Sequence, residues 1–184
     1  MRINGGGNRT IANYYNYLVN KYGKLSGMAY CAGIVDILPI QSIDYNHIDN
    51  IFTINHHIPL LFIQTFIDTI NSSDISIVIV SSVVGVNPAS GMMAYSASKA
   101  AITQSCKSIA NNCKIRINTI SPSDINTPMT MNELVKPLVE QRLDSYPFGI
   151  GEPNDVANMT IFLLSNKAKY LSGQNYIIDS GGVV

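Results

Sequence analysis

Charged side chains are scarce in this chain of 184 residues: Asp, Glu, Lys and Arg together make up 13% of the sequence, and the formal net charge is zero. No run of lysine and arginine is present. Domains that bind nucleic acid usually carry a basic patch, so the composition argues against nucleic acid as a partner. Hydrophobic residues make up 46% of the chain, which is typical of a globular protein. We expect residues 1–184 to form a single domain with a substantial core.

Long apolar runs are absent as well. No stretch approaches the roughly 20 apolar residues that a membrane-spanning helix needs. The chain starts Met1-Arg2-Ile3 without the apolar region of a secretory signal. The three cysteines form no Cys-x-x-Cys pair and leave one over, which favours a reduced setting. We therefore expect a cytoplasmic protein that does not bind a membrane.

A glycine-rich phosphate loop is the third absence. The stretch GGGN at residues 5–8 precedes a helical pattern over residues 9–22, and a helix N-terminus can bind a phosphate. The dinucleotide fingerprint G-x-G-x-x-G, however, needs a glycine where Thr10 stands. We expect residues 1–8 to be a flexible lead-in to a helix. No metal site is expected, because the histidines lack the spacing of a metal-binding motif. They are His47, His56 and His57.

Three reactive side chains lie close together in the middle of the sequence. Residues 75–80 form a β-branched run that predicts a buried strand, and Ser82 follows at its carboxyl end, where open α/β sheets bind ligands. A helical pattern begins near Gly91. Tyr95 and Lys99 are four residues apart, so they share one face of that helix. The sequence therefore predicts that a hydroxyl, a phenol and an ammonium meet at one end of the sheet.

Such a group of side chains suits acid–base chemistry. A free tyrosine has a pKa of about 10, and a neighbouring cation lowers that pKa. We expect Lys99 to lower the pKa of Tyr95, which would make Tyr95 a general acid or base for a carbonyl or an alcohol, with Ser82 bonded to the same oxygen. The alternative is a half-buried tyrosine beside a solvated lysine, since pairs at this spacing are common on helices. Spacing alone leaves both interpretations open.

The setting of these residues, Ser-Ser-Val-Val-Gly followed by Tyr-Ser-Ala-Ser-Lys, resembles the signature of the short-chain dehydrogenase/reductase family. The resemblance extends from about residue 8 to the end and is most similar to the branch of 3-oxoacyl-carrier-protein reductases. Four more stretches agree with the family in the same order. They are Cys31-Ala32-Gly33-Ile34, Asn55, residues 117–129 with Asn118, Pro122 and Thr127, and residues 170–182 with Gly173, Gln174 and Asp179.

The resemblance implies an oxidoreductase that transfers a hydride between NAD or NADP and a small carbonyl or secondary alcohol. It implies that Tyr95 is the acid/base and that Lys99 lowers its pKa and holds the nicotinamide ribose. Ser82 would position the substrate oxygen, and Asn55 would anchor a water in a proton relay. The residues that the resemblance places at the cofactor are Ala32, Gly33, Tyr95, Lys99, Pro122, Ile125 and Thr127.

The fold expected from the resemblance is α/β, a doubly wound (Rossmann-like) parallel sheet that is truncated at the N-terminus. Residues 130–146, called here the cover segment, correspond to the family's mobile substrate cover. Ser123 stands where the family has glycine, and a serine would be strained there if the position needs a positive φ. Strands are expected at residues 26–31, 75–80, 114–120 and 174–179, and helices at residues 9–22, 45–70 (with a kink at Pro59), 91–112 and from 152.

The half of such folds that carries the phosphate loop and the ribose-selecting residue has no counterpart in this sequence. The strand at residues 26–31 would then lie unpaired at an edge of the sheet, and proteins normally cover such an edge. We therefore expect a homo-oligomer or a partner chain at this edge. The alternative function is a catalytically impaired or non-catalytic scaffold, or a partner subunit, with the same fold.

Overall fold

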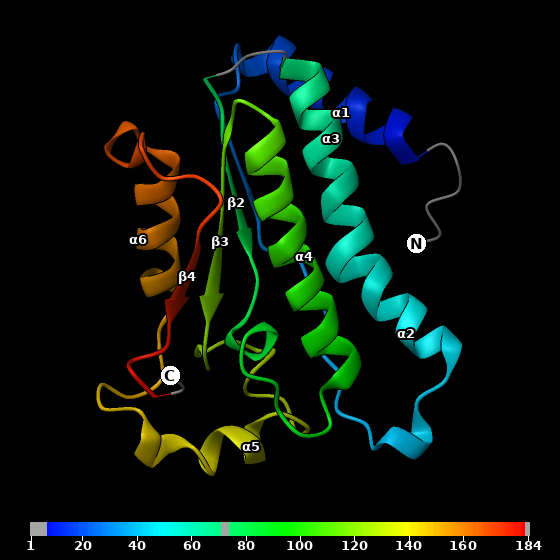
Figure 1. Ribbon diagram of the computed structural model, residues 1–184, viewed down its shortest axis with the longest axis vertical. Helices are drawn as coiled ribbons and strands as arrows, with labels where there is room; N and C mark the ends of the chain where they lie inside the picture. Colours follow the sequence, from blue (N-terminus) through cyan, green and yellow to red (C-terminus); the bar gives the residue numbers. More distant parts are fainter. Residues whose placement is uncertain (1–6, 71–73, 183–184) are drawn as a thin grey trace.

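The computed structural model describes residues 7–70 and 74–182 of the chain. Its centre is a parallel sheet of four strands in the order β1-β2-β3-β4 (Figure 1). Neighbouring strands run parallel, with Ala29 of β1 beside Val78 of β2 and Val80 of β2 beside Ile120 of β3. The α/β class and the doubly wound parallel sheet expected from the sequence are confirmed. The strands are β1 (Gly27–Tyr30), β2 (Ser76–Val80), β3 (Arg116–Pro122) and β4 (Asn175–Ile178).

Helices cover both faces of this sheet. Figure 1 shows α3 and α4 on one side of the strands and α6 on the other, while the short α5 crosses near the carboxyl ends of the strands. Helix α1 packs against α3, where Tyr15 meets Phe66 edge to face. The helices are α1 (Gly7–Tyr22), α2 (Tyr45–Phe52), α3 (Ile58–Ile70), α4 (Met93–Asn112), α5 (Lys136–Glu140) and α6 (Pro153–Leu164).

Strand β2 shows why the core forms here. Ile77 and Ile79 pack into the cluster beneath α1, α3 and α4, whereas Val78 points to the opposite cluster beneath α6. All three side chains are at most 1% exposed. Because successive side chains of a strand face opposite sides, a strand between two helical layers needs apolar residues throughout. Each such side chain stabilises the fold by about 1.5–3 kcal/mol.

The long helix expected over residues 45–70 is interrupted by a turn of π-helix, Thr53–His57, between α2 and α3. The Ile58 N–H donates to the Thr53 carbonyl, five residues back, and Pro59 follows directly. A proline ring clashes with the carbonyl four residues before it in a regular α-helix, and the wider π turn relieves that clash. The kink predicted at Pro59 is therefore a π turn, and Asn55 lies inside it with 2% of its surface exposed.

Several boundaries differ from the predicted ones. Helix α1 begins at Gly7, so the last two residues of the expected lead-in are helical, and residues 1–6 lie outside the described part of the chain. Strand β3 begins two residues later than predicted and extends to Pro122, because its carboxyl end pairs with Ile178 of β4. Ser123 is not among the residues with positive φ, so a serine fits there without strain; Ser180 is, with φ 60°.

The cover segment contains more regular structure than a loop. It includes α5 and a 3-10 turn, Leu143–Ser145, and it buries Val139 and Tyr146. At the other side of the sheet, β1 pairs with β2 and stands at an edge, as the sequence predicts. Gly27 and Ala29 of this strand are exposed. A chain that covers this edge stays a prediction.

Candidate active site

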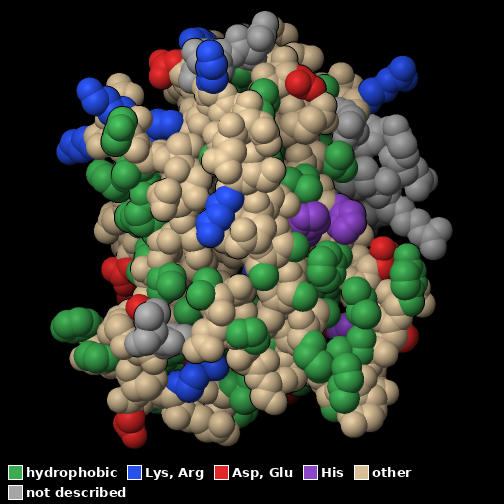
Figure 2. All heavy atoms as spheres, in the orientation of Figure 1, with side chains coloured by type: hydrophobic (Ala, Val, Ile, Leu, Met, Phe, Trp, Pro, Cys, Tyr) green, Lys and Arg blue, Asp and Glu red, His purple; other side chains and the backbone are tan. Residues whose placement is uncertain are grey.

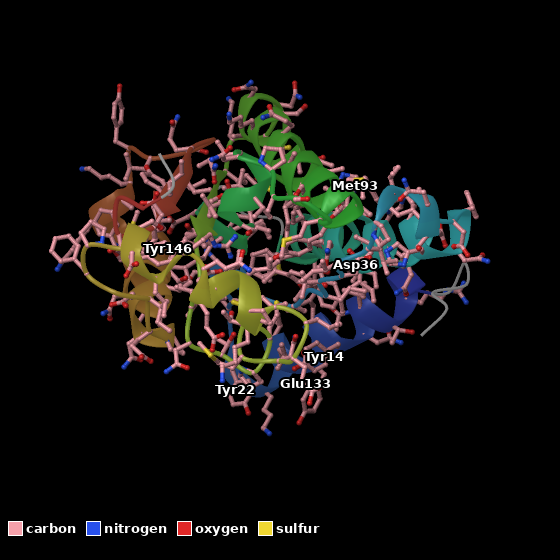
Figure 3. All side chains as sticks on the ribbon, turned by 90° about the horizontal axis from the view of Figure 1, so that it is seen from below. Tyr14, Tyr22, Asp36, Met93, Glu133 and Tyr146 are labelled. Atoms are coloured by element: carbon pink, nitrogen blue, oxygen red, sulfur yellow. The ribbon has the colours of Figure 1, made fainter. Side chains whose placement is uncertain are left out.

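A cavity of about 370 Å³ opens at the carboxyl ends of β1, β2 and β3. Figure 3 views this end of the molecule, with Tyr146 of the cover segment toward α6 and Asp36 toward α2. The cover segment forms part of the cavity wall through Thr130, Val135 and Arg142 as well as Tyr146. The rest of the wall comes from the ends of the strands, the turns that follow them and α4, and includes Cys31, Gly33, Val80, Ser82, Val84, Met92, Tyr95, Lys99, Pro122, Asp124, Ile125 and Thr127.

Ser82, Tyr95 and Lys99 all line this cavity, as their spacing predicts. Ser82 begins a 3-10 turn, where its hydroxyl accepts from the Val84 N–H at 3.4 Å and also hydrogen-bonds the Tyr95 side chain. The Lys99 ammonium donates to the Val80 carbonyl at 3.0 Å and lies 5.8 Å from the centroid of the Tyr95 ring. The three side chains therefore meet at one end of the sheet, and their catalytic roles stay predictions.

Gly85 explains how helix α4 reaches this position. A Cβ atom at Gly85 would lie 2.9 Å from the Ala100 nitrogen and 3.1 Å from the Lys99 Cβ. Real side chains do not tolerate such distances to backbone, so only glycine lets the turn after β2 approach α4 so closely. The glycine in the stretch Ser-Ser-Val-Val-Gly thus sets the distance between Ser82 and the helix that carries Tyr95.

The electrostatics of Tyr95 differ from the expectation. Burial raises the pKa of Tyr95, and the hydrogen bond from Ser82 opposes this only in part. Burial also lowers the pKa of Lys99 to about 8, while Cys31 acts in the opposite direction. The net shift of the Tyr95 pKa is therefore upward, and the expected lowering by Lys99 stays a prediction. For both groups, removal from water is the largest cause of the pKa shift.

Asn55 lies behind the cavity rather than in its wall. Its Oδ1 accepts from the Ile34 N–H at 2.9 Å, and its NH₂ group donates to the Ile34 carbonyl at 2.9 Å and to the Ser98 hydroxyl at 3.1 Å. Ser98 in turn donates to the Tyr95 carbonyl at 2.7 Å. Asn55 therefore ties the turn after β1 to the first turns of α4, and so fixes the position of Tyr95 relative to Gly33.

The residues predicted at the cofactor fall into two groups. Gly33, Pro122, Ile125 and Thr127 line the cavity, together with Tyr95 and Lys99, whereas Ala32 is exposed and is not a lining residue. The role of Ala32 at the cofactor stays a prediction that the lining of the cavity does not support.

The cavity suits the nicotinamide riboside end of NAD(P). A Cβ atom at Gly33 would lie only 3.3 Å from the Lys99 Nζ and 3.2 Å from the Asn55 Oδ1, so this glycine leaves space beside the ammonium. The ammonium of Lys99 is a donor for ribose hydroxyls, and the Thr127 hydroxyl, 3.2 Å from that of Thr130, is a donor or acceptor for an amide. These groups fit that end of the cofactor.

Sequence reasoning missed one cluster in the cavity wall. Asp124 follows β3 and receives two hydrogen bonds from Arg142 through Nη2, at 2.9 and 3.0 Å, and a third from Nε at 3.2 Å. The Tyr146 hydroxyl donates to the same carboxylate at 2.7 Å. A single acid after a strand and an opposite charge in the cover segment were the only signals in the sequence.

Charged and metal-ligating side chains outside the cavity were the other candidates for a site. On the face in Figure 2, a few Lys and Arg side chains lie near one another at the upper left, while the Asp and Glu side chains are dispersed. Within residues 7–70 and 74–182, no three His, Cys, Asp or Glu side chains are grouped as a metal site would require. No helix in the described part of the chain is long and apolar enough to cross a membrane.

Comparison with known proteins gives a consistent result. Residues 6–182 match the family described as enoyl-(acyl carrier protein) reductase. A 2,5-dichloro-2,5-cyclohexadiene-1,4-diol dehydrogenase of Sphingobium indicum is 32% identical over 169 residues, which are 89% of this chain and 67% of that protein. A 3-oxoacyl-[acyl-carrier-protein] reductase of Thermotoga maritima is 32% identical over 175 residues, 91% of this chain and 70% of the relative.

Two further similarities agree with these. A cyclopentanol dehydrogenase of Comamonas testosteroni is 30% identical over 165 residues, 86% of this chain and 66% of the relative. The chain thus spans about two thirds of the length of the curated relatives that it matches. The ligand-free structure of aldohexose dehydrogenase from Thermoplasma acidophilum superposes with a TM-score of 0.86 at 26% identity and covers 96% of this chain and 74% of that one.

Proposed function

Because the chain belongs to the short-chain dehydrogenase/reductase family, we propose that it transfers a hydride between NAD or NADP and a carbonyl or secondary alcohol. One observation carries the proposal. Ser82, Tyr95 and Lys99 line a single cavity at the carboxyl ends of the strands, and the side chains of Ser82 and Tyr95 are hydrogen-bonded. This is the edge at which doubly wound sheets bind their ligands.

Each side chain has a distinct task in this proposal. The cofactor, when bound, supplies or accepts the hydride. The substrate oxygen lies against the Ser82 hydroxyl and the Tyr95 phenol, and the phenol gives that oxygen a proton during reduction. Burial keeps Tyr95 in the protonated form that this step needs, because burial raises the pKa of Tyr95. The Lys99 ammonium binds the ribose and stabilises the phenolate that proton transfer leaves behind.

The cavity wall supports an uncharged substrate. Val84, Met92 and Tyr95 belong to one apolar cluster at this end of the sheet. Among the charged side chains that line the cavity, Asp124 and Arg142 neutralise one another. At the wall formed by the cover segment, a substrate that carries a carboxylate or phosphate would therefore find no uncompensated partner, and the Lys99 ammonium is assigned to the ribose. Cyclic ketones are the first compounds to test, since two of the relatives are named for cyclic alcohols.

The second candidate function is that of a non-catalytic scaffold or partner subunit. It is supported by the edge position of β1, whose exposed Gly27 and Ala29 leave room for another chain. Cofactor binding separates the two candidates, since only the oxidoreductase requires it.

The test is a titration of the purified protein with NADH and with NADPH, followed by the fluorescence of the nicotinamide. The oxidoreductase proposal predicts saturable binding below about 1 mM, within the usual range of enzyme affinities. Lys99→Met should weaken binding by about tenfold or more. Lys107→Met is the matched control, because Lys107 lies exposed two turns further along α4. Folded protein that binds neither nucleotide at about 1 mM would favour the scaffold.

A further inference from the structure

The carboxylate of Asp124 links the cover segment to the end of β3. Asp124 stands directly after β3, and both of its oxygens accept from Arg142, while the Tyr146 hydroxyl adds a bond to Oδ2. Arg142 and Tyr146 lie near the end of the cover segment, 18 and 22 positions after Asp124. Bidentate pairs of this kind fix the orientation of both partners as well as their distance.

The Tyr146 ring is also held from its other side. A Cβ atom at Gly182 would collide with this ring, so the backbone of the turn after β4 lies directly against it. Nearby, the Phe148 N–H donates to the Ser180 hydroxyl at 2.9 Å. Burial and the contact with Asp124 raise the pKa of Tyr146 to about 12, so its hydroxyl stays protonated and remains a donor. Tyr146 is therefore fixed between the ends of β3 and β4.

We propose that Asp124 is a positioning residue that holds Arg142 and Tyr146, and with them the cover segment, against the cavity in which the substrate binds. All three side chains line the same cavity as Tyr95 and Lys99. The Asp124–Arg142 ion pair then helps to determine the shape of the part of the cavity that binds the substrate, together with the apolar residues of the cover segment. The statement about substrate binding rests on the proposed function; the statement about the cover segment does not.

The charges explain why Asp124 has this effect. The side chain of Asp124 is 13% exposed and that of Arg142 is 32% exposed, so water screens the pair only in part. A neutral amide at position 124 would leave the guanidinium without its anion in a half-buried wall, and the guanidinium would turn toward water. The cover segment would then lose its orientation while the core of the protein stayed intact.

Two variants and a control test this inference. Asp124→Asn removes the charge and keeps the shape, and Tyr146→Phe removes only the hydroxyl and keeps the ring against Gly182. The matched control is Glu140→Gln, which removes one charge from the same segment, in the exposed Lys136–Glu140 pair. Amide hydrogen exchange of peptides from residues 130–146 is measured for all four proteins, and KM and kcat are measured with a cyclic ketone.

In Asp124→Asn we expect exchange in the cover segment to accelerate at least about tenfold, and KM to rise about tenfold with kcat changed less than about threefold. Tyr146→Phe should show a smaller change in the same direction, and Glu140→Gln should match the wild type. A merely structural role would alter stability without this division between KM and kcat. If exchange in Asp124→Asn equals that in Glu140→Gln, or if kcat falls while KM is unchanged, the inference is wrong.

The failure of the proposed function has a different signature. A wild-type protein without turnover would remove the kinetic readout, and the exchange rates alone would then decide whether Asp124 holds the cover segment. Faster exchange confined to residues 130–146 supports the inference in that case. Unchanged exchange overturns it.

Discussion

The hydroxyl of Ser82 hydrogen-bonds the side chain of Tyr95 at the carboxyl end of β2. This bond lowers the pKa of Tyr95, whereas burial of the ring raises it by more. Ser82 therefore brings the pKa of Tyr95 closer to the neutral range, in which the phenol can exchange a proton.

The first prediction concerns this bond. Without the hydroxyl, as in Ser82→Ala, the pKa of Tyr95 rises further, and the substrate oxygen loses one donor. We expect kcat/KM to fall about 100-fold, as when one donor to a reacting oxygen is removed elsewhere. In the direction of alcohol oxidation, which needs the phenolate, the rising limb of the pH–rate profile should move to higher pH. Ser90→Ala, in the exposed part of the same loop, should leave the profile unchanged.

The second prediction follows from the burial of Lys99, whose pKa is about 8 against an ordinary 10.5. The folded protein releases this proton before the unfolded chain does, so the lysine's contribution to stability is complete above about pH 10.5 and is lost as the pH falls through 8. We expect the free energy of unfolding of the wild type, relative to Lys99→Met, to rise by about 2 kcal/mol between about pH 7 and pH 10. Urea denaturation measures it.

Lys107→Met provides the control for that series, because Lys107 is an exposed residue of the same helix. Its difference from the wild type should be flat over the same pH range. A flat difference for Lys99→Met as well would mean that the ammonium is not buried.

The third prediction concerns Asn55. Asn55→Ala removes the partners of both backbone groups of Ile34 and one partner of Ser98, and should cost about 2–4 kcal/mol of stability in urea denaturation. Asn55→Asp should cost at least as much, since a carboxylate cannot donate to the Ile34 carbonyl. Asn50→Ala, exposed on α2, should change stability by less than about 0.5 kcal/mol. Equal stability of all three variants would refute the proposed role of the amide.

The fourth prediction uses the cysteines as reporters of the cavity. Cys31 lines the cavity, while Cys113 lies at the far end of α4 and is partly exposed. We expect bound NAD(P)H to slow the alkylation of Cys31 by iodoacetamide and to leave Cys113 unaffected, as measured by peptide mass spectrometry. Burial raises the pKa of Cys31, so its labelling should also become faster as the pH rises. Equal labelling of Cys31 with and without saturating cofactor would place the nucleotide elsewhere.

The sequence predicts the regular parts of the fold because their signals are local. The β-branched run at residues 75–80 becomes β2, and the helical spacing of Tyr95 and Lys99 brings both side chains to one face of α4. For the π turn at Thr53–His57 the local signal is Pro59, which predicts a kink but not the kind of turn that makes it. Local patterns therefore predicted the elements and the place of the kink, but not the π geometry that buries Asn55.

The parts of the site that the sequence did not predict depend on distant contacts. Asp124 meets Arg142 and Tyr146 only because the cover segment folds back over β3. The direction of the pKa shift of Tyr95 depends on how deeply the ring is buried, and spacing on a helix carries no information about that. Spacing predicted that Ser82, Tyr95 and Lys99 meet in space, whereas their burial determines the direction of the pKa shifts of Tyr95 and Lys99.

The central claim is that the Tyr95 phenol gives a proton to the substrate oxygen during reduction. The most direct measurement is the rate of ketone reduction by Tyr95→Phe at saturating NADH or NADPH, with Tyr45→Phe, which is 78% exposed at that position, as the control. We predict that Tyr95→Phe binds the cofactor as the wild type does and loses about a thousandfold in kcat, within the range for a general acid. A variant that reduces the ketone within about threefold of the wild-type rate would contradict the claim.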